Sequence, residues 1–176
     1  MKNSPLIFLS LSIALCTVTL AKSQSKTEKT ILSNTRQHSF SDPKKKDTFT
    51  ITLTGQSILN GNVSFKIRDC KKTIIYEQKF KAEDLLGDMA DVLNSRQQQD
   101  TIESRIRKFF NEKNYTSPAI AANDKFYEDN STKEVWNDIK SNKAAIGFLF
   151  SYGYEGTYGI AYSKKKHKVV TYFYSD

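Results

Sequence analysis

The chain has 176 residues and carries 27 lysine and arginine residues against 19 aspartate and glutamate residues, for a formal net charge of +8. This length suits one folded domain with an adequate core. Only two cysteines and two histidines are present. A disulfide framework, a zinc site or a histidine-based catalytic site would therefore have few residues to draw on, and we expect no metal, no cofactor and no catalytic residues.

The positive charge is concentrated in two segments, residues 24–46 and residues 164–168. The aromatic residues do not interleave with a broad basic surface, as binding of single-stranded nucleic acid would require. We therefore expect no nucleic-acid partner. A weak, salt-sensitive attraction to an anionic envelope surface remains compatible with this charge pattern.

The first residues are typical of a secretory signal peptide. Residues 5–20 are apolar but contain several serines and threonines, so the stretch is too short and too polar for a membrane span. Small residues allow cleavage after Ala21 or after Ser23. We take residues 1–23 as the signal peptide and predict an exported protein, periplasmic or secreted, with no transmembrane span once the signal is removed.

The two cysteines have different expected fates. Lipid attachment at Cys16 is disfavoured because Leu15 stands where a small residue would be needed. Removal of the signal peptide would leave Cys70 as the one cysteine, which cannot form a disulfide within the chain. Residues 24–46 are rich in serine, threonine, lysine and glutamine, and we predict a flexible leader there, followed by a single domain over 47–176.

The domain is predicted to begin with three strands. Apolar side chains alternate with threonines in the first, which indicates a strand with one solvated face. Asn60-Gly61 predicts a two-residue hairpin turn. The apolar positions on the two sides of that turn are out of phase, so we predict a β-bulge near Gly55 that brings Leu53 opposite Ile67. Residues 73–80 are the third predicted strand.

Helical spacing of apolar residues predicts three helices after these strands. The first covers residues 84–93, the second is N-capped by Asp100, and the third is opened by a capping box from Ser131 to Glu134. Trp136, the one tryptophan, is read as a core anchor, with a pocket wall as the alternative. Residues 111–130 lack a clear period, and such segments are often functional or act as lids.

Six of the nine tyrosines lie in residues 144–176, where three further strands are predicted. Small residues on the opposite face, such as Gly159, leave room for a close approach to the sheet. The tyrosines either belong to a half-buried sheet or form a platform for a glycan or an extended peptide. The candidate ligand-binding residues of such a platform are Tyr152, Tyr154, Tyr158, Tyr162 and Tyr172.

Catalytic patterns are weak. Ser163 and Lys166 match the S-x-x-K pattern of serine–lysine nucleophiles, but such matches arise by chance in a lysine-rich chain. Glu77, Asp124 and Glu155 are dispersed carboxylates that a small hydrolase could use.

The predicted fold class is α+β. We expect one mainly antiparallel sheet, built from an N-terminal and a C-terminal three-strand meander, with three intervening helices packed on one face. The alternative is that the two meanders face each other. The predicted function is an exported, non-catalytic binding protein of the cell envelope or secretome, with an unknown protein or glycan partner. An inhibitor or immunity-type protein that blocks an enzyme, and a small secreted hydrolase, are the alternatives.

Overall fold

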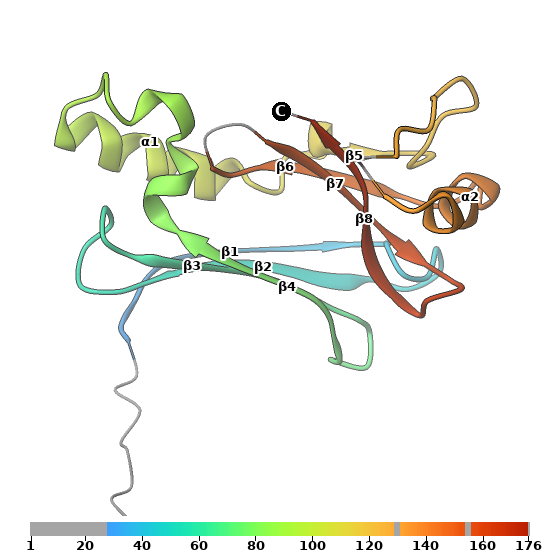
Figure 1. Cartoon of the computed structure of the whole chain (residues 1–176). Helices are drawn as coiled ribbons and strands as arrows, with labels where there is room; N and C mark the ends of the chain where they lie inside the picture. Colours follow the sequence, from blue (N-terminus) through green and yellow to red (C-terminus); the bar gives the residue numbers. More distant parts are fainter. Residues whose placement is uncertain (1–27, 129–130, 154–155, 176) are drawn as a thin grey trace, which may run out of the picture.

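The computed structural model describes residues 28–128, 131–153 and 156–175. The predicted signal peptide, with Cys16 and both candidate cleavage sites, lies outside the described residues. Within them the chain forms two four-stranded antiparallel sheets and two α-helices (Figure 1). No helix of this described part is long and apolar enough to cross a membrane.

The first sheet has the strand order β1-β2-β3-β4, and the second has the order β5-β6-β7-β8. The strands of the first sheet are β1 (Thr30–His38), β2 (Asp47–Thr54), β3 (Asn62–Arg68) and β4 (Ile74–Lys81). Those of the second are β5 (Tyr115–Thr116), β6 (Gly147–Ser151), β7 (Thr157–Ser163) and β8 (Lys168–Ser175). The α-helices are α1 (Ser95–Lys108) and α2 (Lys133–Ser141), and 3₁₀ turns occur at Ala82–Leu85, Gly87–Met89 and Glu112–Asn114.

The α+β class and the antiparallel pairing are confirmed, but the single sheet is wrong. The two sheets lie in separate layers (Figure 1), and their apolar faces meet in one core. Phe49 and Phe65 of the first sheet pack on Phe148 of the second, with ring centres 5.5 and 5.6 Å apart. Each sheet has an apolar face, and these two faces bury each other together with Ile102 and Ile106 of α1.

Residues 30–38, expected to belong to a flexible leader, form the edge strand β1. Its core-facing position opposite Ile51 is Asn34, whose Nδ2 atom donates to the carbonyl oxygens of Ile106 and Arg107, each at 3.0 Å. Asn34 thereby satisfies carbonyl groups at the C-terminal end of α1. Because a polar side chain occupies a core-facing position, β1 shows no apolar alternation.

The connection between β2 and β3 also differs from expectation. Residues 55–61 form a longer loop instead of a two-residue turn at Asn60-Gly61. The strands are then in phase, and Leu53 lies opposite Val63, so the predicted bulge and the pairing of Leu53 with Ile67 are wrong. A longer loop removes the conflict in parity that the bulge was meant to resolve.

Only two of the three predicted helices form among the described residues. Residues 84–93 contain two 3₁₀ turns instead, because Gly87 adopts a left-handed φ of 60° that interrupts the helix. Val92, expected on the buried stripe, is 76% exposed. The chain enters α1 through Asn94, whose side chain accepts from the backbone N–H groups of Arg96 and Gln97, and not through Asp100.

The third predicted helix is confirmed as α2. Its N-cap is Thr132, one residue later than the Ser131 expected, and Thr132 Oγ1 accepts from Val135 N at 3.3 Å. Trp136 and Ile139 are buried as predicted. They pack with residues of the second sheet in a cluster that is separate from the core between the two sheets.

Candidate ligand-binding pocket

The outer face of the second sheet is covered by α2 and by the segment that follows β5. Trp136 and Ile139 of α2 pack with Ala161 of β7 and Tyr172 of β8, together with Ile120. This cluster is separate from the core between the sheets. It fixes a second layer on the sheet and leaves a hollow beside Trp136.

Strand β8 carries an extra residue at Tyr172, on the face that α2 covers. Gly159 pairs with Phe173, and Ile160 pairs with Thr171, so Tyr172 has no partner in the ladder. Such a bulge re-aims the side chains around it. Tyr172 is 4% exposed and packs in the outer cluster, away from the core between the sheets.

Two glycines make room for the Tyr172 ring. A Cβ atom on Gly159 would lie 3.1 Å from Tyr172 Cζ, and one on Gly147 would lie 2.5 Å from Tyr172 Oη. The sequence predicted a close approach on this side of the sheet. The group that approaches is a tyrosine of the same chain.

Tyr172 and its neighbours line a pocket with a volume of about 520 Å³. Strand residues and Ala119 form one part of the lining, Trp136 of α2 forms another, and the segment after Ala119 supplies exposed polar residues. The complete lining is Thr116, Ala119, Asn123, Asp124, Lys125, Tyr127, Trp136, Leu149, Tyr172 and Phe173. The combination of an apolar floor and a polar rim is typical of small-ligand sites.

The rim is held in place by contacts to α2. Asp124 closes a turn in which its Oδ2 atom accepts from Ala121 N at 2.7 Å. Lys140 of α2 donates from Nζ to the Asp124 carbonyl oxygen at 2.8 Å, and the same Nζ lies 5.9 Å from the centre of the Trp136 ring. A cation at this distance from an indole face is attracted to it. The lysine therefore connects the rim to the wall of the pocket.

The Tyr172 phenol stays neutral at ordinary pH. Burial raises its pKa above the usual tyrosine value, and the charge of Asp124 raises that pKa further, while the Thr116 hydroxyl acts in the opposite direction. The pocket therefore holds a neutral phenol close to one carboxylate.

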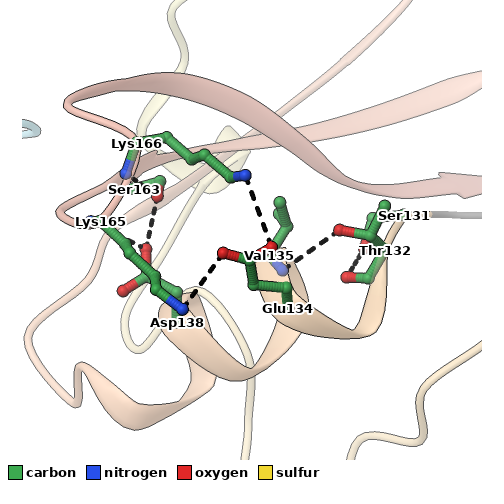
Figure 2. A network of polar contacts seen from close by, with 8 residues as sticks. All are labelled: Ser131, Thr132, Glu134, Val135, Asp138, Ser163, Lys165 and Lys166. Carbon is green, nitrogen blue, oxygen red and sulfur yellow. Dashed lines mark hydrogen bonds and ion pairs between the residues drawn. The ribbon is translucent and has the colours of Figure 1, made fainter.

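The position of α2 is fixed from its other side by the β7–β8 hairpin (Figure 2). Ser163 is fully buried, and its Oγ atom donates to Asp138 Oδ2 at 2.5 Å. Glu134 pairs with Lys165 at 3.1 Å and with Lys166 at 3.5 Å. The hydrogen bond from Lys165 is the main reason that the pKa of Glu134 is lowered.

This network assigns Ser163 and Lys166 a structural role. The backbone N–H of Lys166 donates to Ser163 Oγ at 2.9 Å, whereas its ammonium group points to Glu134 (Figure 2). The Ser163 proton is directed to Asp138. The S-x-x-K match is therefore part of a hairpin turn, and its lysine does not act as a base on the serine.

The candidate tyrosines do not share one face. Tyr152 stacks on Phe80 with ring centres 4.6 Å apart and on Tyr158 at 4.8 Å, on the side of the second sheet that faces the core. Tyr162 is half-buried against the same core. Tyr172 lies on the opposite face, and Tyr154 lies outside the described residues.

The dispersed carboxylates are also kept apart. Glu77 pairs with Lys66 at 3.2 Å and Lys79 at 3.3 Å on the outer face of the first sheet, while Asp124 lies on the rim over the second. Glu155 falls outside the described residues. Within the part of the chain that the structure describes, no group of three acidic, histidine or cysteine residues is placed to hold a metal ion.

Sequence reasoning missed most of the pocket. Leu149, Phe173 and Tyr127 carried no signal of their own, although Tyr127 falls in the irregular segment 111–130 that was expected to be functional. Trp136 serves both roles considered for it, because it is a core anchor that is 5% exposed and also a pocket wall. Comparison with protein-family models, curated proteins and solved structures found no match.

Proposed function

We propose that this protein is an exported, non-catalytic binding protein and that the pocket behind the second sheet is its contact site. The observation that carries the proposal is the pocket itself. Its volume of about 520 Å³ lies within the range of sites for small ligands, and buried side chains of three separate chain segments hold its walls. Export rests on the signal-peptide pattern of the N-terminal sequence.

A binding role suits the chemistry of the lining better than a catalytic one. The described lining contains one carboxylate, that of Asp124, and neither histidine nor cysteine. One oxygen of this carboxylate is already bound to Ala121 N. Glycoside hydrolysis generally needs two carboxylates on either side of the scissile bond. This composition favours binding over the small-hydrolase alternative.

The proposal is tested by affinity capture from the native exported fraction, with a tagged chain recovered from that fraction. Tyr127→Ala changes the rim at a side chain that is 59% exposed, so the fold should be unaffected. We expect this variant to lose the captured ligand, while the control Val92→Ala, at another exposed apolar residue, keeps it. Equal capture by both variants would contradict the proposal. Capture of one enzyme by the rim would support the inhibitor-type alternative.

A further inference from the structure

Resting on the proposed function, we infer that the pocket binds one sugar unit of a neutral glycan. The lining has three properties that favour such a ligand: an apolar floor, a rim with both hydrogen-bond donors and acceptors, and a balance of charge. Together they match a ring that has an apolar face and hydroxyl groups around its edge.

The floor offers a surface for the apolar face of such a ring. Leu149 and Phe173 lie side by side across β6 and β8 and are only partly buried, so part of each side chain is open to the pocket. Tyr127 adds an exposed ring at the rim. Aromatic faces carry negative electrostatic potential, which attracts the weakly positive C–H groups of a sugar ring.

The rim offers partners for hydroxyl groups. Asn123 supplies an amide that both donates and accepts, Asp124 supplies an acceptor, and Lys125 supplies a donor. A purely apolar ligand would bury these groups without partners, which is costly. A sugar has several hydroxyl groups and can satisfy all three.

The charges argue against an ionic ligand. Asp124 and Lys125 carry opposite charges at the same rim, so an anion would meet a carboxylate and a cation would meet an ammonium group. The position over the Trp136 ring that would suit a cation is already taken by Lys140. A neutral ligand therefore fits best.

The position of the pocket also favours a glycan over an extended peptide, the other candidate ligand. Extended peptides commonly bind by adding a strand to the edge of a sheet, through backbone hydrogen bonds. This pocket lies over the face of the second sheet and is lined by side chains.

Trp136 makes the inference measurable, because it is the one tryptophan of the chain and forms a wall of the pocket. Its fluorescence is followed while the full chain is titrated with N-acetylglucosamine, glucose and their β-1,4-linked disaccharides. Glucosamine, which is cationic, and glucuronic acid, which is anionic, are the matched charged probes. We expect a saturable change with at least one neutral sugar and weaker binding of its charged counterpart.

Two variants locate the binding. Tyr127→Ala should lower the affinity for the neutral sugar by about fivefold, as expected for the loss of one ring contact. Val92→Ala should leave that affinity unchanged. No saturable change with any neutral sugar, or equal binding by Tyr127→Ala, would overturn the inference. If capture of the native ligand still depends on Tyr127 in that case, the proposed binding site stands and only the ligand class is wrong.

Discussion

At the scale of single residues, the pocket depends on two glycines that allow a tyrosine to lie across a sheet. A side chain at Gly159 would meet Leu149 and Tyr172 at 3.1 Å and the Cβ atom of Phe173 at 2.9 Å. All three of these residues line the pocket. The shape of the floor is therefore set by the absence of one methyl group.

Gly159→Ala is expected to destabilise the fold by about 1–3 kcal/mol, because the added methyl group overpacks a close contact. It should also shift the emission of Trp136, since Tyr172 and Trp136 share one cluster. Urea unfolding and fluorescence measure both effects, with Val92→Ala as the control. An alanine variant as stable as the wild type, with unchanged emission, would show that the floor is not tightly packed.

Residue patterns predicted part of this site. The small residue at position 159 indicated a close approach to the sheet, and the structure confirms it. The residue patterns could not identify Tyr172 as the group that fills the space, because alternation does not show which face of β8 lies on the same side of the sheet as Gly159. The bulge at Tyr172 places Phe173 on the same side of the sheet as Tyr172, and nothing in the local sequence of β8 indicates it.

At the scale of elements, α2 is held between the pocket and the β7–β8 hairpin. Its buried contact is the hydrogen bond from Ser163 to Asp138, and its exposed contact is the pair of lysines on Glu134 (Figure 2). A buried hydroxyl without an acceptor is costly, whereas exposed ion pairs contribute little. The buried bond should therefore dominate the docking of this helix.

Asp138→Ala is expected to lower the free energy of unfolding by about 1–3 kcal/mol, because the Ser163 hydroxyl would be left buried without an acceptor. Adding Ser163→Ala should recover part of that loss, since the unpaired group is then removed. A double-mutant cycle by urea unfolding measures the coupling. Additive losses would show that the two side chains are not coupled.

The edge strand β1 gives a second test at this scale. Asn34→Ala removes both hydrogen bonds to the end of α1 and should cost about 1 kcal/mol. Amide exchange at the C-terminal turn of α1 should become faster. Gln37→Ala, on the opposite face of β1, is the matched control. If the amides of this turn exchange at the same rate in both variants, β1 does not stabilise the helix.

Elements with an apolar period could be predicted, and those without one could not. The β6, β7 and β8 strands and α2 carry alternating or helically spaced apolar residues, so their positions followed from the sequence. For β1 the core-facing residue Asn34 is polar because it bonds a helix end. The first predicted helix failed because Gly87 turns the chain out of the helical conformation.

At the scale of the whole molecule, two sheets enclose one core, and the second sheet carries a further layer. Sequence patterns gave the α+β class and antiparallel pairing but favoured a single sheet. Alternation shows which face of a strand is apolar, yet it does not show what covers that face. That question was answered by long-range contacts such as Phe65 with Phe148.

The buried phenols make stability depend on alkaline pH. Burial is the main cause that raises the pKa of Tyr76, Tyr152 and Tyr172 above the ordinary value of 10.0. In the unfolded chain these phenols ionise near the ordinary value, whereas the folded chain keeps them neutral to higher pH. Their stabilising effect is therefore fully present below about pH 10 and is lost as pH rises further.

The urea midpoint should thus fall steadily above about pH 10, before all tyrosines have ionised in the folded protein. Ultraviolet absorbance of phenolate, recorded in the same samples, follows that ionisation. An unchanged midpoint, with every tyrosine ionising at its ordinary pKa, would mean that these rings are open to water.

The pocket over the second sheet is the proposed place of contact with the ligand. The most direct measurement places a photoreactive benzophenone side chain at position 127 on the rim, or at position 74 on the first sheet, where Ile74 is also exposed. Each protein is irradiated in the native exported fraction, and the covalent products are identified by mass spectrometry. We expect a defined product from position 127 and none from position 74. A defined product from position 74 alone would contradict this expectation.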